Sequence, residues 1–184
     1  MKVPSLRKMH SYVTLNCLLA VLQSFLFIST GFAGNGVAIA FKDKSKQSDS
    51  RFIDHENGII TDIETGLMWT KMDSYADLGK CLNWNESKIY VSDLRTGGYR
   101  DWRMPEEKEL KSIYDKSQWN KMSFDHNYPI HLDKIFEDGA AYWYWLLGST
   151  GSCCARILNF LNGAVNELKR EHCFNMGVRA VRNV

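Results

Sequence analysis

The sequence predicts an α+β domain in which an antiparallel sheet is combined with two helices and a long irregular loop. Three observations support this class. Short β-prone runs broken by turns occupy residues 51–70, and two helical patterns follow between residues 85 and 115. β-Prone runs then return between residues 142 and 181. Residues 117–139 connect the helices to these strands, and a loop this long in a compact domain is often functional.

The N-terminus has the pattern of a signal peptide. Three Lys or Arg residues and no acidic residue precede an apolar run over residues 13–28. This run is shorter than the ~20 apolar residues needed to span a bilayer. Small residues follow it, and we expect cleavage after Ala33, with Ala38-Ile39-Ala40 as the alternative site. An uncleaved membrane anchor is the competing interpretation.

These features divide the chain into a signal peptide (residues 1–33), a flexible lead-in (34–50) and a single domain (51–184). The whole chain has 23 basic and 21 acidic residues, but three of the basic ones lie in the signal peptide. The remainder has a net charge of about −1 and lacks the basic excess of a nucleic-acid-binding protein. We expect it to be secreted or periplasmic, without stable membrane insertion after cleavage.

The first strands are expected at residues 52–53 and 59–61, on either side of a turn that ends in Asn57-Gly58. A second turn at Thr65-Gly66 leads into a third β-prone run at residues 67–69. Short strands separated by glycine-containing turns are typical of an antiparallel meander.

The first helix is expected over residues 86–94. Asn85 is a suitable N-cap, and Gly97-Gly98 ends the helical pattern. Ile89 and Leu94 are expected to face the core.

Pro105 is expected to open the second helix, because its fixed φ and missing N–H are tolerated in the first turn. Glu106 and Glu107 then lie at the positive end of the helix dipole. The buried stripe of this helix is expected to consist of Leu110, Ile113 and Tyr114.

The C-terminal half is expected to return to strands. One turn of helix is predicted at residues 132–136, within the long loop. Asn162-Gly163 lies between two β-prone runs, which is the strongest short-range signal for a hairpin. The strands are expected at residues 142–147, 156–160, 164–168 and 178–181.

The candidate ligand-binding residues are aromatic or basic side chains in or near the long loop. Aromatic faces stack on sugars and suit recognition surfaces. Four tryptophans, at positions 69, 84, 102 and 143, are expected in the core instead. The candidates for ligand contact are Trp119, His126, Tyr128, Tyr144 and Arg156.

Several fragments, taken in their order along the chain, resemble one bacterial family. They are Gly66-Leu67-Met68-Trp69, residues 97–105 with Glu109-Leu110, Tyr142-Trp143, the hairpin at 159–165 and the final Val178-Arg179-Ala180-Val181-Arg182. The pattern resembles the C-terminal domain of the Legionella collagen-like protein, over residues 51–182.

The resemblance implies a C-type-lectin-like fold and an extracytoplasmic location. The member that gives the family its name is an adhesin whose domain binds sulfated glycans. The same broad fold includes the formylglycine-generating enzymes, which have a similar helix led by Arg-x-Pro. Fold alone does not decide function, so a ligand-binding domain and an enzyme or enzyme accessory both follow from the resemblance.

The sequence departs from the family pattern at two cysteine positions. Members commonly have one cysteine on the first helix and another in a final VRCVR motif, where this chain has Val91 and Ala180. Both replacements are apolar, as expected of two buried sites that lost a disulfide together. The family motif YWSST is also altered, to Tyr142-Trp143-Tyr144-Trp145.

Four cysteines remain after the predicted cleavage, and an even number outside the cytosol favours two disulfides. A two-residue turn at Asn162-Gly163 would place Cys154 on the same face of the hairpin as Cys173, with Cys153 pointing away. We therefore expect one disulfide between Cys154 and Cys173 and another between Cys153 and Cys81.

Other chemistry has weaker support. Cys153 or Cys154 with His172 or His126 would form a nucleophile–base pair, but a disulfide is the commoner state outside the cytosol. The carboxylates within residues 101–109 are interpreted as capping and solvent-exposed groups. Neither zinc-site spacing nor a calcium motif of C-type lectins occurs, so we expect no metal and no cofactor.

We therefore expect a non-enzymatic, lectin-like domain that binds a glycan or a cell-surface protein and does not bind nucleic acid. An extracytoplasmic enzyme or enzyme accessory is the alternative, and a structural component of the cell envelope is a third. The sequence leaves the oligomeric state open. Two sparse basic groups are available to contact a sulfated glycan, namely Arg100, Arg103, Lys108 and Lys111, and Lys169 with Arg170.

Overall fold

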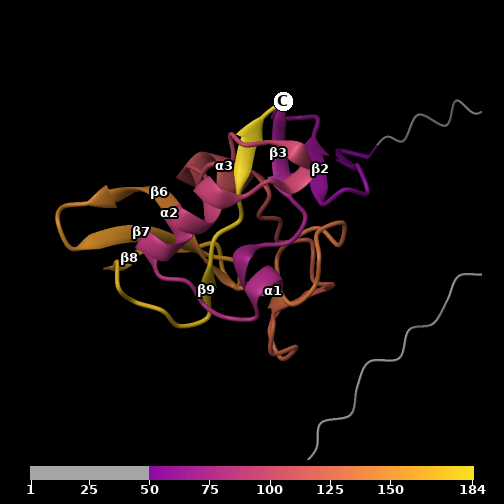
Figure 1. Cartoon of the computed structure of the whole chain (residues 1–184). Coiled ribbons are helices and arrows are strands. Elements are labelled where there is room, and N and C mark those ends of the chain that lie inside the picture. The colour runs from indigo at the N-terminus through magenta and orange to yellow at the C-terminus, as the bar shows by residue number, and fades with distance from the viewer. Residues whose placement is uncertain (1–49) are drawn as a thin grey trace, which may run out of the picture. The chain divides into compact units, whose positions relative to one another are not determined.

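A computed structural model of the chain describes residues 50–184 (Figure 1). The predicted signal peptide, and all of the predicted lead-in except Ser50, lie outside the described residues. No helix among residues 50–184 is both long enough and apolar enough to cross a membrane. The described part is an α+β unit with two four-stranded sheets, which confirms the predicted class.

The first sheet contains the predicted meander together with the end of the chain. Trp69 pairs with Ile60 on one side and with Val181 on the other, and all three side chains are buried. Every pairing in this sheet is antiparallel. In spatial order the strands are β1 (Phe52–Asp54), β2 (Ile59–Asp62), β3 (Leu67–Thr70) and β10 (Val181–Asn183).

The second sheet contains the predicted C-terminal hairpin and one additional edge strand. β6 pairs with β7, and β7 with β8, in antiparallel register. β9 pairs with β6 in parallel, so the expectation of a purely antiparallel sheet is wrong at this edge. The parallel pairing is possible because a long connection, not a hairpin, joins the two strands. In spatial order they are β8 (Val165–Lys169), β7 (Cys154–Asn159), β6 (Trp143–Thr150) and β9 (Met176–Gly177).

The connection between β7 and β8 is wider than the predicted two-residue turn. The amide of Asn159 donates to the carbonyl of Ala164 at 2.9 Å, so residues 160–163 form the loop. Phe160 explains the difference, because its side chain is fully buried and its amide donates to the carbonyl of Tyr142 at 2.8 Å. Drawing Phe160 into the core requires more chain than a two-residue turn provides.

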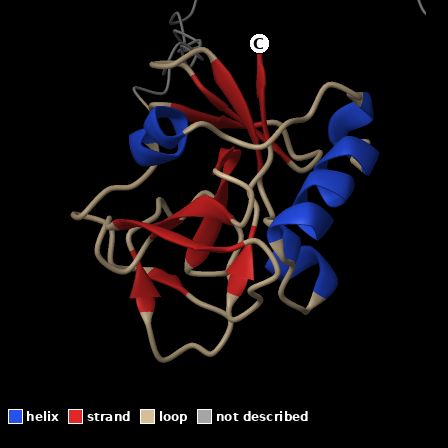
Figure 2. Ribbon diagram, turned by 90° about the vertical axis from the view of Figure 1, so that its left-hand side faces the viewer, coloured by secondary structure: helices blue, strands red, loops and turns tan. Residues whose placement is uncertain are grey.

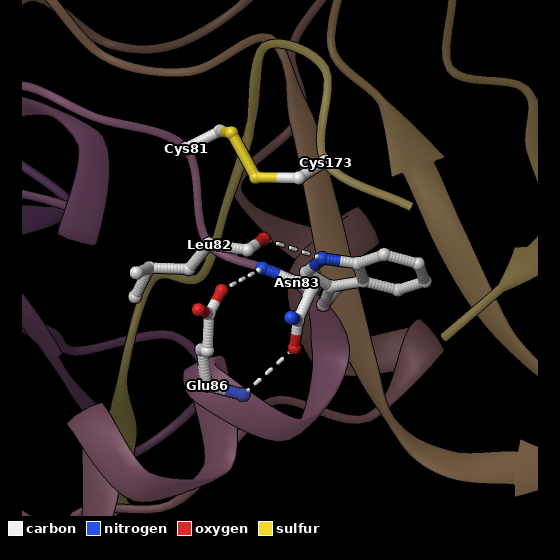
Figure 3. Close-up of a disulfide and its surroundings, with 6 residues drawn as sticks. Cys81, Leu82, Asn83, Glu86 and Cys173 are labelled. Atoms are coloured by element: carbon white, nitrogen blue, oxygen red, sulfur yellow. Dashed lines mark hydrogen bonds between the residues drawn. A yellow bond between two sulfur atoms is a disulfide. The ribbon is translucent and has the colours of Figure 1, made fainter. Parts of the chain in front are cut away.

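The first predicted helix is present as α2 (Trp84–Asp93), but its N-cap is Asn83 and not Asn85. The Asn83 side chain accepts a hydrogen bond from the amide of Glu86 at 3.0 Å, and the Glu86 carboxylate accepts one from the amide of Asn83 at 2.8 Å (Figure 3). This reciprocal pair is a capping box. Ile89, expected to face the core, is 62% exposed.

Two further α-helices flank the strands. The second predicted helix is α3 (Glu107–Ser112), with a buried Leu110, but it begins after Pro105, the expected first residue, and Glu106 is its N-cap. A five-residue helix, α1 (Ser74–Leu78), was not predicted, and Asp73 caps it. A short 3-10 helix, η1, follows α2 at Thr96–Gly98. Helical segments lie on two sides of the strands in Figure 2, so the helices are not confined to one side.

The long loop contains a short ribbon that the sequence did not reveal. β4 (Lys121–Met122) and β5 (Pro129–Ile130) pair antiparallel, with Lys121 opposite Ile130. The helical turn predicted at residues 132–136 is absent, and these residues form bends and turns instead.

The core of the described part of the chain consists of two hydrophobic clusters. Val91 and Ala180 are both buried in the second cluster, which fits the interpretation that this chain has lost a disulfide of the family there. The predicted burial of tryptophans is confirmed for Trp69, Trp84 and Trp102, while Trp143 is only partly buried.

The disulfides differ from the predicted pairing. Cys81 is bonded to Cys173, and Cys153 is bonded to its neighbour Cys154. The expected Cys154–Cys173 and Cys153–Cys81 bonds are therefore wrong. The hairpin register is the reason, because Lys169 lies opposite Cys154 and leaves Cys173 beyond the end of β8.

Candidate functional site

A tight turn joins the two strands of the ribbon. The amide of Ser123 donates to the carbonyl of Tyr128 at 3.1 Å, which closes the turn. The carboxylate of Asp125 accepts from the Ser123 hydroxyl at 2.6 Å and from the Asn127 amide at 3.2 Å. His126 has a positive φ of 56°, and its amide donates to the Ser123 carbonyl at 2.9 Å. These bonds set the positions from which Phe124 and Tyr128 project.

Four aromatic side chains form a continuous row at this turn, and we call them the aromatic surface. The ring of Tyr75 on α1 lies 4.5 Å from that of Phe124. Phe124 stacks nearly parallel on Tyr142, with centroids 5.9 Å apart, and Tyr142 lies 6.1 Å from Tyr128. Tyr128 is 51% exposed and Tyr142 is 8% exposed, so the row reaches solvent at the Tyr128 end.

The loop before β9 borders the aromatic surface. The side-chain amide of Asn175 donates to the Tyr142 hydroxyl at 2.5 Å. Asn175 has a positive φ of 53°, a conformation that asparagine tolerates better than most residues. The preceding residue, Phe174, is 60% exposed. A polar side chain from this loop thus lies beside the row of rings, and an exposed apolar residue directly precedes it in the chain.

The disulfide between Cys81 and Cys173 fixes this loop to the segment just before α2 (Figure 3). The amide of Leu82 donates to the carbonyl of Met176 at 3.2 Å. The carbonyl of Leu82 accepts from the indole N–H of buried Trp145 at 2.9 Å. A covalent bond and two hydrogen bonds therefore hold the loop on a buried support, which is how a binding surface is kept rigid.

The polar groups at the aromatic surface can both donate and accept hydrogen bonds. Burial raises the pKa of the Tyr142 hydroxyl, which keeps it protonated. The Ser123 hydroxyl lowers the pKa of Asp125, which stays a carboxylate down to acid pH. The Asn175 amide completes a set of one hydroxyl, one carboxylate and one amide.

The five predicted ligand-binding residues do not form one site. Tyr128 and His126 lie at the turn, where Tyr128 joins the aromatic surface. Trp119 is 61% exposed, but it lies at the opposite end of the β4–β5 ribbon, with its ring 4.5 Å from that of His131. Trp119 and Tyr128, the two exposed aromatic candidates, therefore lie at opposite ends of the ribbon and do not share one site.

The other two candidates lie elsewhere. Tyr144 is fully buried, and its hydroxyl donates to the carboxylate of Asp73 at 2.6 Å, so its selection as a surface contact is wrong. Arg156 lies on β7 and forms an ion pair with Glu107 of α3. Tyr144, Trp145 and Leu146 are consecutive on β6 and all buried, so both faces of the sheet are covered there and Tyr144 has no outward position.

Sequence analysis missed Tyr75, Phe124, Tyr142 and Asn175. Three of these are aromatic residues separated by long stretches of chain, and no local pattern connects them. The sequence shows several aromatic residues near the long loop, but the partners come from α1, the ribbon turn and the residue directly before β6. Their meeting depends on the tertiary fold alone.

The remaining surface offers fewer functional features. Among residues 50–184, no three His, Cys, Asp or Glu side chains are grouped to hold a metal ion. Two open cavities of about 100 and 310 Å³ lie away from the aromatic surface, the larger beside Leu67 and Lys108. In the expected basic group on the second helix, Arg103 is paired with Glu109 and Lys111 with Glu107.

Comparisons with known proteins agree with the resemblance seen in the sequence. The family model described as the Lcl C-terminal domain matches residues 58–182, which is more than half of the chain. None of the curated proteins compared with the chain matches it.

Proposed function

Because this chain belongs to the Lcl C-terminal domain family, we propose that its described part is a lectin-like domain that binds carbohydrate through the aromatic surface. The row of rings formed by Tyr75, Phe124, Tyr142 and Tyr128 is the observation that carries this proposal. Pyranose rings have apolar C–H faces that pack on aromatic rings, and hydroxyl groups that need hydrogen-bond partners.

The polar groups beside the rings can serve as hydrogen-bond partners for the hydroxyl groups of a sugar. The Tyr142 hydroxyl, the Asn175 amide and the Asp125 carboxylate lie at the edge of the aromatic surface. A ligand site typically combines an apolar platform with a few placed polar groups that set orientation. The combination favours a sugar over a purely apolar ligand, because it supplies partners for several hydroxyls.

The proposal includes a C-type-lectin-like fold and an extracytoplasmic location, as the resemblance implies. Two disulfides in the described residues support an oxidising environment. The enzyme alternative has less support, because all four cysteines of the described residues are in disulfides and none is a free thiol.

A glycan array with the disulfide-bonded protein tests the proposal. Tyr128→Ala is expected to weaken binding to any glycan found by at least about fivefold, because Tyr128 is the most exposed ring of the row and truncating an aromatic anchor commonly costs more than about 1 kcal/mol. Tyr128→Phe keeps the ring and is expected to retain most of the affinity.

Trp119→Ala is the matched control, since it removes a similarly exposed aromatic side chain from the other end of the ribbon. This variant is expected to bind as the wild type does. Loss of binding in Trp119→Ala with unchanged binding in Tyr128→Ala would contradict the proposed site and place the binding site at the Trp119 end of the ribbon. Absence of binding to every glycan would favour a surface protein as the ligand.

A further inference from the structure

The vicinal disulfide between Cys153 and Cys154 lies at the tip of the hairpin formed by β6 and β7. Thr150 is the last residue of β6 and pairs with Cys154, the first residue of β7. Gly151 turns the chain with a positive φ of 62°. Cys153 is exposed and Cys154 is partly exposed, so an external thiol can reach the sulfur atoms.

This bond contributes little to the stability of the fold. A disulfide stabilises mainly by shortening the free chain of the unfolded state, and the gain grows with the length of the closed loop. Cys81 and Cys173 are 92 residues apart in sequence, whereas Cys153 and Cys154 are adjacent. The vicinal bond closes only a small ring, and stabilisation of the folded chain does not account for it.

The two disulfides also differ in geometry, because Cys153 and Cys154 are adjacent in sequence. The Cα atoms of Cys153 and Cys154 are 3.7 Å apart, the spacing that any two consecutive residues have. Ordinary disulfides join Cα atoms about 4.4–6.8 Å apart, and the Cys81–Cys173 bond, at 5.7 Å, lies within this range. Disulfides that are exposed or outside the usual geometry are the more easily reduced ones.

Arg170 holds the hairpin tip independently of the sulfur–sulfur bond. Its backbone amide donates to the Cys153 carbonyl at 3.0 Å. Its side chain donates to the Cys154 carbonyl at 3.2 Å and to the Gly151 carbonyl at 2.7 Å, and the guanidinium lies 4.9 Å above the ring of Trp84. None of these contacts involves a sulfur atom, so they do not depend on the bond being closed, and a positive charge at the tip favours the thiolate form of a cysteine.

We propose that Cys153 and Cys154 form a reversible thiol–disulfide exchange site whose co-reactant is a dithiol reductant. One thiolate of the reductant attacks Sγ of the exposed residue Cys153, forming a mixed disulfide and releasing the Cys154 thiolate. The second thiol of the reductant then attacks the mixed disulfide and releases Cys153. Two thiols are formed on this chain, and the reductant becomes a disulfide, so electrons and protons balance. The Cys81–Cys173 bond takes no part.

A redox titration of the whole folded protein tests this inference. The protein is equilibrated in buffers with increasing ratios of reduced to oxidised dithiothreitol, the free thiols are alkylated, and peptide mapping assigns each label. Cys153 and Cys154 are expected to become half-reduced at a ratio at least about tenfold lower than Cys81 and Cys173 require, a separation of about 30 mV. The chain has a fifth cysteine, Cys17, and peptide mapping distinguishes its label from those of the other four.

Two double variants serve as matched controls. The variant with Cys153→Ser and Cys154→Ser is expected to lose the early phase, meaning the reduction step at the lower ratio of reduced to oxidised dithiothreitol. The variant with Cys81→Ser and Cys173→Ser is expected to retain it. The inference is overturned if the four cysteines open in one step, if the early phase maps to Cys81 and Cys173, or if the oxidised protein contains a peptide linking Cys153 or Cys154 to either of them. If a variant does not fold, the peptide mapping of the wild-type protein still shows which pair of cysteines is reduced first.

Discussion

The guanidinium of Arg179 and the carboxylate of Asp73 are both fully buried, with Nη2 of the arginine 3.7 Å from Oδ2 of the aspartate. Nη1 of Arg179 donates to the carbonyls of Thr70 and Lys71 at 2.8 and 2.7 Å. Residues 178–180, expected in the last strand, instead connect β9 of the second sheet to β10 of the first. The arginine therefore ties this connection to the end of β3.

Asp73→Asn is expected to destabilise the protein strongly. Asp73 accepts hydrogen bonds from the Tyr144 hydroxyl, the Ala141 amide and the Ala76 amide, and it is the acidic partner of Arg179. Removing one partner of a buried charge pair typically costs about 3–5 kcal/mol.

Guanidinium denaturation measures this change in the free energy of unfolding. Asp77→Asn, an exposed change on the same helix, is the control and is expected to cost less than about 1 kcal/mol. Equal effects of the two substitutions would contradict a structural role for the buried pair.

Gly97→Ala is expected to cost about 2–4 kcal/mol, and Gly98→Ala only about 1–2 kcal/mol. Both glycines have a positive φ, at 63° and 83°, so an alanine is strained at either position. At Gly97, however, a new Cβ would lie 2.0 Å from Cδ1 of Ile59, a buried core side chain, whereas nothing lies within 4 Å at Gly98. Urea unfolding of both variants checks the difference, and a larger loss for Gly98→Ala would refute this account.

Replacement of Cys81 and Cys173 by serine is expected to lower the free energy of unfolding by about 2–5 kcal/mol, because the bond closes a long loop of the unfolded chain. The same replacement at Cys153 and Cys154 is expected to cost less than about 1 kcal/mol. Denaturation without reductant makes the comparison. A large loss for the vicinal pair alone would show that its bond, and not the long-range one, stabilises the fold.

Stability is expected to fall in acid through the pair formed by Asp62 and Arg51. Burial alone would raise the pKa of Asp62, but hydrogen bonds from Arg51 and Thr65 outweigh it and hold this pKa below its ordinary value. A folded pKa below the unfolded one contributes stability that is complete above the unfolded pKa, about 3.9, and is lost as pH falls through the folded pKa.

Asp62→Asn is therefore expected to destabilise the protein at pH 7 by about 1–3 kcal/mol and to have a smaller effect near pH 2. Unfolding curves at both pH values measure this. Glu64→Gln, which changes an exposed neighbour of Arg51, is the control with little expected effect. An effect of Asp62→Asn that does not depend on pH would contradict the ion-pair explanation.

Local patterns in the sequence were sufficient for the class of the fold and for most of its elements. The meander at residues 52–70, α2 and the β7–β8 hairpin each follow from turn residues and periodicity within a short window. The family resemblance also rests on residues in their linear order, and the family match confirms it. Some errors at this level are small shifts, such as the capping of α2 by Asn83 in place of Asn85. Others are whole short elements, because α1 and the β4–β5 ribbon were not predicted and the helical turn predicted at residues 132–136 is absent.

The tertiary structure alone decided which distant residues meet. The loop widened by Phe160 changed the hairpin register, and with it the partner of every cysteine. The aromatic surface joins α1, the ribbon turn and the residue directly before β6, and the burial of Tyr144 depends on what covers both faces of its sheet. Periodicity specifies which side of an element is apolar, but distances between elements depend on loop lengths and side-chain volumes that no local window contains.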